Sequence, residues 1–391
     1  GAWCRERGVE YIGHLIEDDN HHTRTGSSLG HYFRGLAGQD MAGIDDIGGQ
    51  VFPQGEDINY YHHIFAHRNG EFYHYLLGKL ADSAAAIEPR KKGRAIFGNY
   101  GWAEGVRLEK YLVDHFLVRG INHFVPHAFS AKEYPDPDCP PHFYANGHNP
   151  QYRHFGCLMA YTNRVCELLN DGTHIAPVAI LYHAEGDWTG KHMTCDQVGH
   201  LLADAQIDYD ILPQDVFEDR ESYRTKITTN TLHVNTQSYR AVIIPYSQFI
   251  TAPTAKAIDE LKAAGIPVLY VNGIPEGVCD GDAAIPSADC VMLENLTGTL
   301  RELHIPELTL SPANDRIRYR HYVHSDGSDV FLFINEGTEP YHGIITLSED
   351  LNKTVYLYDA WENQLEALDT EGQRFHLDIE PLHSRIAVFD Q

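Results

Sequence analysis

Side chains that could carry acid–base chemistry gather near the ends of apolar segments in the first third of the chain. The candidates for catalysis are Glu17, Asp45 and Glu104, and the candidates for ligand binding are His14, Asp18, His22, Asn99, Tyr100, Trp102, His123 and His127. Two carboxyl groups that flank a bond can act as general acid and as base or nucleophile, the arrangement that hydrolyses glycosidic bonds. Their separation, about 5–5.5 Å or about 6.5–9.5 Å, decides whether the configuration is retained or inverted.

Each candidate also has a purely structural explanation. Carboxylates at strand ends, such as Glu17 and Asp45, commonly cap helices or solvate loops. Glu104 falls in the first turn of a predicted helix, where the helix dipole already favours a carboxylate, and this explanation is the stronger one for it. Tyr100 and Trp102 either stack on the apolar face of a sugar ring or pack in the core.

Histidines are abundant in the same stretch and have two chemical interpretations. His123 and His127 lie four residues apart in a predicted strand, so they share one face and could donate hydrogen bonds to hydroxyl groups. Zinc is the alternative, because imidazole is a common zinc ligand. Neither an HExxH motif nor a Cys/His pair at zinc-site spacing is present, so we expect no metal and no other cofactor.

These residues must be positioned by alternating strands and helices. The hydrophobic periodicity predicts strands at 10–18, 41–48, 94–101 and 121–130, and helices at 31–39, 58–68, 71–86, 103–120 and 157–172. Four such units make half of a (β/α)8 barrel, which binds ligands at the C-terminal ends of its strands. We predict that residues 1–174 are the C-terminal half of a barrel whose first units lie outside this sequence; an open sheet is the alternative.

A second α/β domain is predicted at 175–305. Strand patterns at 178–183, 207–212, 239–249 and 266–273 alternate with helical patterns at 192–206 and 251–265, as in a flavodoxin-like doubly wound sheet. Amidotransferase chemistry would need a cysteine after a central strand, but the strand 239–249 carries Tyr246, Ser247 and Gln248 there. We therefore expect this domain to be structural and to mediate a homo-oligomer. Glu185 and Trp188, after its first strand, could reach the barrel mouth and bind substrate.

The last segment and the composition complete the prediction. Period-two alternation in short strands predicts a small antiparallel β-sandwich at 306–391. The net charge of −25 argues against nucleic-acid binding, and no apolar run is long enough to cross a membrane. Seven cysteines without a CxxC pair are typical of reduced thiols, so we expect a cytoplasmic protein. Secretion or a periplasmic location stays open, because a leader could precede this sequence.

Four stretches and the order of the domains resemble glycoside hydrolases. The stretches are FGNYGWAEG (97–105), VRGINHFVPHAFS (118–130), DPDCPPHFYANGHNPQYRHF (136–155) and APVAILYHAE (176–185). They look like bacterial glycosidases labelled as family 2 or α-L-rhamnosidase-like. The domain order is similar to family 42 β-galactosidases, which have a barrel, an amidotransferase-like trimerisation domain and a sandwich.

The resemblance implies an enzyme that hydrolyses oligo- or polysaccharides, with retention if it follows family 42. Such barrels place an acid/base Glu after strand four and a nucleophilic Glu after strand seven. If 94–101 is strand seven, the expected Glu falls on Arg94, Ala95 and Ile96. Either Glu104 substitutes or the chain lacks its nucleophile, and a different strand count makes Glu17 the acid/base. The alternative is a non-catalytic carbohydrate-binding or assembly subunit.

Overall fold

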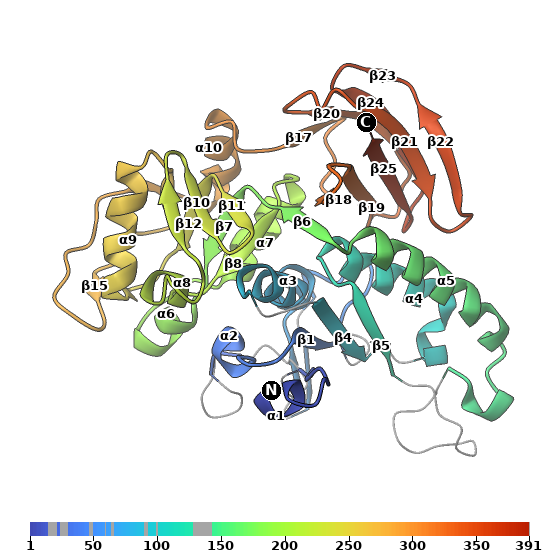
Figure 1. Ribbon diagram of the computed structural model, residues 1–391, viewed down its shortest axis with the longest axis horizontal. Helices are drawn as coiled ribbons and strands as arrows, with labels where there is room; N and C mark the ends of the chain where they lie inside the picture. The colour runs from blue at the N-terminus through green and yellow to red at the C-terminus, as the bar shows by residue number, and fades with distance from the viewer. Residues whose placement is uncertain are drawn as a thin grey trace.

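In the computed structural model, the described residues form three parts that pack together: a partial barrel, a doubly wound domain and a sandwich. The residues described are 1–14, 22–23, 30–46, 50–58, 60–63, 66–89, 93–98, 101–127 and 143–390. In Figure 1 a small parallel sheet with its helices lies below, a doubly wound sheet lies on the left, and the antiparallel sandwich lies at the upper right. The fold class predicted from the sequence is confirmed.

The partial barrel is a parallel sheet with strand order β1-β4-β5. Its elements are α1 (Ala2–Arg5), α2 (Tyr32–Gly35), β1 (Met41–Asp46), the hairpin β2 (Tyr60–His63) and β3 (Ala66–Arg68), the π-helical turn Phe72–Leu77, α3 (Gly78–Ile87), β4 (Gly93–Gly98), α4 (Gly101–Val118), β5 (His123–Pro126) and α5 (Tyr152–Leu168). Ile44 of β1 and Ile96 of β4 bury their side chains in the same core as Leu80 of α3. Helices therefore cover one face of this sheet.

The predicted helix 58–68 is wrong, and the predicted strand 10–18 is not formed in its described part, since residues 15–18 lie outside the described residues. Residues 10–14 form no strand, because Tyr11 exchanges hydrogen bonds with Asp40: the Tyr11 amide donates to the Asp40 carboxylate and the Asp40 amide donates to the Tyr11 carbonyl. The predicted helix 58–68 is instead the antiparallel hairpin β2–β3. Its residues are rich in Tyr, His, Ile and Phe, which fit a strand as well as a helix, so short-range periodicity could not separate the two.

The boundaries of other elements differ from the prediction for identifiable reasons. Three parallel strands are described where four were expected, and β5 ends at Pro126. Helix α5 begins at Tyr152, five residues before the predicted start at 157. Helix α4 breaks at Gly105, whose φ of +77° and ψ of 154° suit glycine. Because of that break, Glu104 does not lie in the first turn of the long helical segment.

The second domain is a five-stranded parallel sheet with order β16-β14-β12-β7-β8. Numbered along the chain, this is the 2-1-3-4-5 order of flavodoxin-like folds. Its elements are β7 (Val178–Leu181), α6 (Ala184–Thr189), α7 (Cys195–Asp204), β8 (Tyr209–Leu212), α8 (Asp215–Glu218), β9 (Lys226–Thr228), β10 (Thr231–Val234), β11 (Gln237–Tyr239), β12 (Ala241–Pro245), β13 (Phe249–Ile250), α9 (Ala252–Ala263), β14 (Val268–Val271), β15 (Gly277–Val278), β16 (Asp289–Val291) and α10 (Leu296–Glu302). Thr251 caps α9 by accepting a hydrogen bond from the Thr254 amide.

The C-terminal sandwich pairs a four-stranded and a six-stranded antiparallel sheet. Its strands are β17 (Leu308–Ser311), β18 (Ile317–His324), β19 (Asp329–Asn335), β20 (Tyr341–Leu347), β21 (Thr354–Asp359), β22 (Gln364–Leu368), β23 (Thr370–Glu371), β24 (Arg374–Ile379) and β25 (Ser384–Asp390). The six-stranded sheet also takes in β6 (Gly172–Ile175), which pairs with β18. The strand that precedes the doubly wound domain is thus part of the sandwich.

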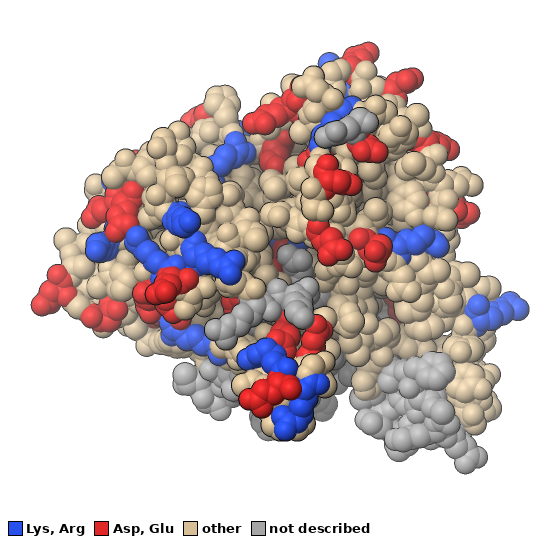
Figure 2. All heavy atoms as spheres, viewed as in Figure 1, with Lys and Arg blue, Asp and Glu red and all other residues tan. Residues whose placement is uncertain are grey.

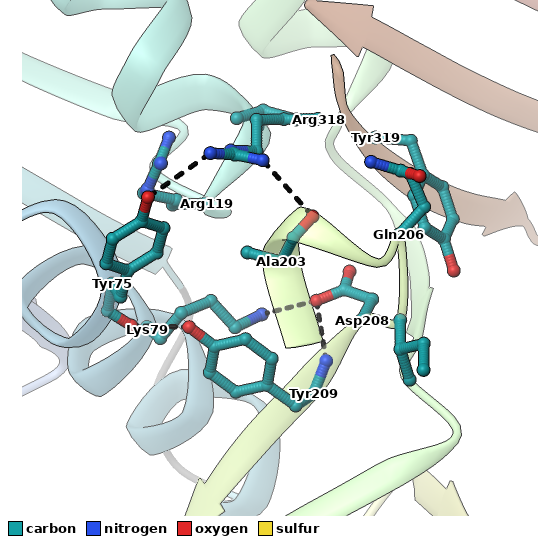
Figure 3. A pocket seen from close by; sticks show the side chains of 11 residues that line it. Tyr75, Lys79, Arg119, Ala203, Gln206, Asp208, Tyr209, Arg318 and Tyr319 are labelled. Carbon is teal, nitrogen blue, oxygen red and sulfur yellow. Dashed lines mark hydrogen bonds and ion pairs between the residues drawn. The ribbon is translucent and has the colours of Figure 1, made fainter. Parts of the chain in front are cut away.

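Buried ion pairs hold α3 of the partial barrel against both the sandwich and the doubly wound domain. Asp82 accepts two hydrogen bonds of 2.8 Å from the Arg320 guanidinium of β18 and one of 2.8 Å from Lys79. Lys79 also donates to Asp208, which precedes β8. Figure 3 shows Lys79 and Asp208 beside Tyr75, Arg119 and Arg318 around a cavity of about 40 Å³, room for about one or two waters.

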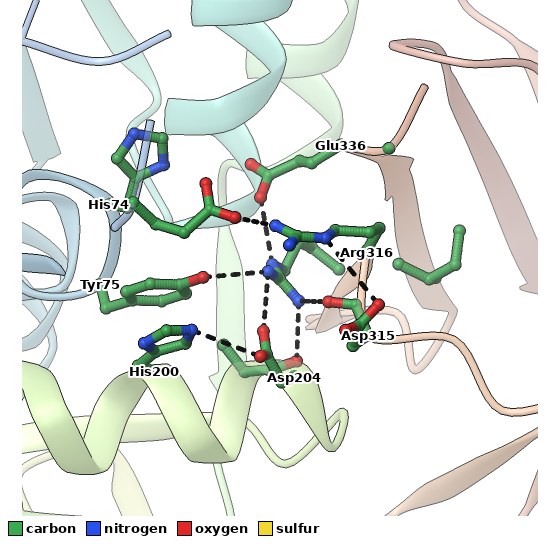
Figure 4. A network of polar contacts seen from close by, with 12 residues as sticks. His74, Tyr75, His200, Asp204, Asp315, Arg316 and Glu336 are labelled. Carbon is green, nitrogen blue, oxygen red and sulfur yellow. Dashed lines mark hydrogen bonds and ion pairs between the residues drawn. The ribbon is translucent and has the colours of Figure 1, made fainter. Parts of the chain in front are cut away.

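A second buried network joins α4 to the sandwich. The carboxylate of Glu336, which follows β19, accepts hydrogen bonds from Arg119 and Arg318 and lies 2.8 Å from the His115 ring. Figure 4 shows Glu336 facing this network of polar contacts, with Tyr75 and Asp204 on its far side. Because these charged groups are buried, each depends on its partners for stability.

His200 gives the contact between the partial barrel and α7 a pH dependence. Its ring stacks on Tyr75 at 4.2 Å and lies 2.9 Å from the Glu71 carboxylate. Burial would lower the pKa of His200, but hydrogen bonds to Asp204 and Glu71 raise it to about 9. A raised histidine pKa means that its stabilising contribution is complete below pH 6.5 and is lost as the pH rises to about 9.

We therefore expect His200→Gln to lower the free energy of unfolding by about 2 kcal/mol at pH 6 and by much less at pH 9.5. Urea unfolding at both pH values measures this difference. The matched control is His342→Gln, whose histidine pairs with Asp378 on the exposed surface and should change stability little at either pH. An equal loss at both pH values would contradict the assignment.

The surface agrees with the charge balance of the sequence. Figure 2 shows acidic and basic side chains interspersed on the visible face, with no continuous basic band. Among the described residues, no helix is both long enough and apolar enough to span a membrane.

Candidate functional site

The C-terminal ends of the three parallel strands form one edge, which we call the strand-end rim. Asp46 of β1, Gly98 of β4 and Pro126 of β5 are neighbours in the sheet register, so the residues next to them meet there. Parallel strands linked by helices place their C-terminal ends on the same side, where ligands bind in barrels. The register therefore brings Asp45 and His127 to the same edge, although they are 82 positions apart in the sequence.

Alternation along the strands separates the rim into two faces. Ile44 and Phe124 pack on the helix-side core, so Asp45 and His123 point to the opposite face, and His127 follows in the turn after β5. This face would be the interior of a closed barrel. Asp45 is buried, and its Oδ2 lies 3.8 Å from Nδ1 of His14. His14 is exposed and could relay or donate a proton at this edge.

The remaining rim candidates divide according to what is described. Glu17, Asp18, Asn99 and Tyr100 lie outside the described residues, and so do the side chains of Trp102 and Glu104. His123 is exposed near the start of β5, whereas His127 is half-buried just past its end. The described residues thus place the buried Asp45 and the half-buried His127 at this edge, with His14 beside Asp45, whereas His123 lies at the other end of β5.

His22 is placed in the core and not on the rim. Its side chain is 4% exposed, and its ring lies 5.3 Å from the rings of both Tyr32 and Phe72. The hydroxyl of Tyr32 donates to the backbone carbonyl of Gly43 in β1. His22 is therefore positioned to support β1 through Tyr32, a structural role for a residue that the sequence suggested as a ligand-binding candidate.

A second polar group, the His31 cluster, consists of His31, Arg34, Glu185, Trp188 and Asp215. His31 caps the short helix α2, and Arg34 on that helix donates to Glu185 at 2.7 Å and to both Asp215 oxygens at 2.7 and 2.9 Å. Nε2 of His31 lies 3.8 Å from one oxygen of each carboxylate. The cluster therefore joins the partial barrel to α6 and α8 of the doubly wound domain.

The electrostatics of this cluster follow from its burial. Glu185 is 5% exposed and His31 is 2% exposed. Burial raises the pKa of the Glu185 carboxyl to about 7, although Arg34 opposes the shift. Burial lowers the pKa of His31 to about 4, although Asp215 opposes it. At neutral pH the histidine is therefore uncharged and the Glu185 carboxyl is close to half-protonated.

Trp188 forms an exposed aromatic wall beside this cluster. Its ring is 41% exposed and lies 5.9 Å from the His31 ring, and the Arg34 guanidinium lies 5.8 Å from the Trp188 ring. The indole N–H donates to the Thr23 carbonyl at 2.6 Å, while the Thr23 hydroxyl donates to Asp187. The tryptophan is thus held in one orientation.

Sequence reasoning found only two of the five residues of the His31 cluster. Glu185 and Trp188 follow the first strand of their domain, a position that suggested ligand contact. His31, Arg34 and Asp215 were missed, because their partners lie more than 150 positions away and no local spacing connects them. The one local signal was the position of His31 at the start of the predicted helix 31–39, where the structure makes it the cap.

Two groups among the described residues have metal-like geometry, and neither suits a metal. In one, His31, Glu185 and Asp215 approach each other, but Nδ1 of His31 accepts the Arg34 amide hydrogen. A neutral imidazole then carries its hydrogen on Nε2, which leaves no lone pair there for a cation. In the other, Asp82, His174 and Asp210 surround Lys79, whose ammonium takes the cation position.

A cysteine–histidine contact in the doubly wound domain is not an activated nucleophile. Sγ of Cys195 lies 3.3 Å from Nδ1 of His183 and donates to the Leu181 carbonyl. Burial raises the pKa of the Cys195 thiol well above its ordinary value and lowers that of His183 to about 3. Both groups therefore stay neutral, which argues against thiolate chemistry at this position.

Comparisons with known proteins identify the fold. A scan against protein-family models finds no match, and neither does a search of curated proteins. Among solved structures, the rhamnosidase from Novosphingobium sp. PP1Y matches 99% of this chain with a TM-score of 0.70 and 15% identity. The exo-carrageenase GH42 from Bacteroides ovatus matches 93% of this chain with a TM-score of 0.58 and 8% identity. The β-galactosidase from Rahnella sp. R3 matches 91% of this chain with a TM-score of 0.59 and 11% identity.

These matches cover only part of the solved proteins. The chain spans 38% of the rhamnosidase, 50% of the exo-carrageenase and 61% of the β-galactosidase. At these identities the similarity concerns the fold alone. The chain has the fold of the corresponding part of these glycoside hydrolases.

Proposed function

We propose that this chain forms part of a glycoside hydrolase and contributes Asp45 of the strand-end rim as one of its two catalytic carboxyl groups. The observation that carries the proposal is the register, which puts Asp45 near the C-terminal end of β1 on the face opposite the helices and His127 just past the end of β5 at the same edge. Ligands bind at this edge in barrel enzymes. The glycosidase fold supplies the substrate class, an oligo- or polysaccharide.

The second carboxyl group is proposed to be Glu17 or Glu104. Both follow the reasoning that a glycosidase needs two carboxyl groups across the scissile bond. Further strands would complete the barrel, because within the described residues β1 pairs only with β4, and β5 only with β4. If the enzyme follows family 42, the reaction retains the anomeric configuration.

The alternative function is a non-catalytic carbohydrate-binding or assembly subunit. The sequence of β4, GRAIFG, favours it, because this strand carries no carboxylate where the resemblance to family 42 implies a nucleophilic Glu. Ala95 and Ile96 have aliphatic side chains and cannot act as nucleophiles. Sugar binding without turnover would be the mark of this alternative. Assembly would use the doubly wound domain, which we propose as a surface for homo-oligomers.

Hydrolysis of aryl glycosides tests the catalytic proposal. The chain is assayed alone and together with a co-expressed first half of a barrel, on α-L-rhamnoside and β-D-galactoside substrates. We expect turnover in at least one sample and a loss of about 10²–10⁴-fold in kcat/KM for Asp45→Asn, because an amide cannot exchange a proton with the substrate.

The control substitution is Asp378→Asn on β24, where the side chain is exposed and remote from the rim. It should leave the rate unchanged. Circular dichroism confirms that both variants are folded. Absence of turnover in every sample would reject the enzyme, and an unchanged rate for Asp45→Asn would reject Asp45 as a catalytic carboxyl group.

A further inference from the structure

We propose that the His31 cluster is a second binding site, which holds a hydroxyl group of an uncharged saccharide. The site lies between α2 of the partial barrel and α6 and α8 of the doubly wound domain (α2, α6 and α8 are labelled in Figure 1). Its location follows from geometry alone, whereas the choice of a saccharide rests on the proposed function.

The donor is Nε2 of His31. Nδ1 accepts a hydrogen bond from the Arg34 amide at 3.2 Å, so the neutral ring must carry its hydrogen on Nε2. That atom is buried and has no hydrogen-bond partner in the described part of the chain. A buried donor without a partner is unfavourable, and a ligand that accepts this hydrogen bond would satisfy it.

The acceptor is Oε2 of Glu185. Oε1 of the same carboxylate accepts from Arg34, whereas Oε2 is buried and also lacks a hydrogen-bond partner among the residues described. Nε2 of His31 lies 3.8 Å from Oε1 of this carboxylate, so the unsatisfied donor and the unsatisfied acceptor belong to neighbouring groups. Such a pair suits a group that accepts one hydrogen bond and donates another. A hydroxyl group does both, and a simple cation or anion does only one.

A cavity of about 640 Å³ lies against the Arg34 and Asp215 side of the cluster, and its lining does not include His31, Glu185 or Trp188. Arg34 and Asp215 of the cluster line it, together with Phe33 and Tyr223. Binding sites for small molecules commonly have this size. Trp188 adds an exposed ring on which the apolar face of a sugar could pack, and its hydrogen bond to Thr23 holds that ring in place.

The arrangement argues against a charged ligand. A metal ion would need the lone pair of Nε2, which is protonated, and would lie next to the Arg34 guanidinium. A carboxylate or phosphate would face both Glu185 and Asp215. A neutral polyol avoids both the repulsion of a cation by Arg34 and the repulsion of an anion by Glu185 and Asp215. The ionic groups Arg34, Glu185 and Asp215 then serve to fix the geometry of the hydroxyl-binding pair.

The test measures binding of L-rhamnose and D-galactose to the folded chain at pH 8 by titration calorimetry. At this pH the Glu185 carboxyl, with its pKa of about 7, is mostly ionised and can accept. We expect Glu185→Gln to weaken binding about tenfold, because its amide replaces the acceptor by a donor. Trp188→Phe should remove any ligand-induced change in fluorescence from that indole.

Glu294→Gln, an exposed substitution in the same domain, is the control and should leave the affinity unchanged. Circular dichroism verifies that each variant is folded. Absence of monosaccharide binding, or equal affinities for Glu185→Gln and Glu294→Gln, would overturn the proposal. Stoichiometric binding of Zn²⁺ or Ca²⁺ that Glu185→Gln abolishes would also overturn it, in favour of a metal site.

The same titration with Asp45→Asn separates this proposal from the catalytic one. That variant removes the proposed catalytic carboxylate but leaves the His31 cluster unchanged. Binding that persists in Asp45→Asn and weakens when Glu185→Gln is added supports the second site even if no glycoside is hydrolysed. Hydrolysis that continues in the absence of such binding would support the enzyme and reject the second site.

Discussion

Replacing Asp82 with asparagine is expected to lower the free energy of unfolding by about 3–5 kcal/mol. Asp82 is fully buried and is the bidentate partner of Arg320, which is itself 1% exposed. It also accepts from Lys79, which is 3% exposed. The neutral amide would leave two buried cations short of negative charge. Removing one partner of a buried ion pair is costly for this reason.

Chemical denaturation at pH 7 measures this loss. The matched control is Asp378→Asn, the same change at a side chain that is 73% exposed, for which we expect less than about 0.5 kcal/mol. Arg320→Met combined with Asp82→Leu should recover part of the loss, because apolar residues can replace a buried pair without an uncompensated charge. A loss below about 1 kcal/mol for Asp82→Asn would show that the pair is not needed for stability.

Glu336→Gln is expected to have an effect of similar size, about 3–5 kcal/mol at pH 7. The carboxylate is the common acceptor for Arg119 and Arg318, so a single substitution affects α4 and the sandwich together. Burial would raise the pKa of Glu336, but Arg119, His115 and Arg318 hold it well below the ordinary value. A lowered pKa means that the contribution of Glu336 is complete above pH 4.5 and is lost as the pH falls through the folded-state pKa.

Because the pKa of Glu336 is lowered, the pH dependence of stability is a second test of its role. The difference in stability between the wild type and Glu336→Gln should shrink when the pH is lowered below 4.5, where the wild-type carboxylate begins to be protonated in the unfolded state. Glu339→Gln, an exposed substitution three positions along the same loop, should be neutral at all pH values. A difference that stays constant down to pH 3 would argue that packing, and not charge, explains the effect.

The two networks bear on the proposed function because they position the strand-end rim. Asp82 lies on α3, which packs against β1, the strand that carries Asp45. Arg119 follows α4, which leads into β5 and its rim residue His127. Ion pairs buried between the layers thus hold the helices behind the rim. Substitutions in either network are expected to reduce both stability and sugar hydrolysis, whereas Asp45→Asn should reduce hydrolysis alone.

The elements that sequence analysis predicted correctly have strong local signals. Helix α9 begins with Thr251 as its cap and ends before Gly265, and its apolar residues recur at helical spacing. The strands at Ala241–Pro245 and Val268–Val271 are continuous apolar runs, which are typical of the centre of a parallel sheet. These features depend on neighbours in the chain, so a single sequence is enough to find them.

The predicted secondary structure was wrong where the local hydrophobic pattern fitted both helix and strand, or where a residue distant in the sequence supplied the hydrogen bonds. Residues 58–68 are compatible with helix and strand, and the pairing of Tyr61 with His67 decided for a hairpin. Residues 10–14 read as a strand, but Asp40 supplies the hydrogen bonds that a sheet would otherwise provide. In both cases the local structure depends on a hydrogen-bonding partner that hydrophobic periodicity cannot predict.

The amino-acid sequence alone predicted a partial barrel followed by a doubly wound sheet and a sandwich. It also predicted that Asp45 lies at the end of a strand. Burial patterns of neighbouring residues are enough for that, because each strand and helix must hide its apolar face. Only the folded chain brought His31 and Arg34 to Glu185 and Asp215, and Asp82 to Arg320. Contacts between charged groups some 150 to 240 positions apart depend on how the layers pack, and the spacing of residues along a sequence carries no record of that packing.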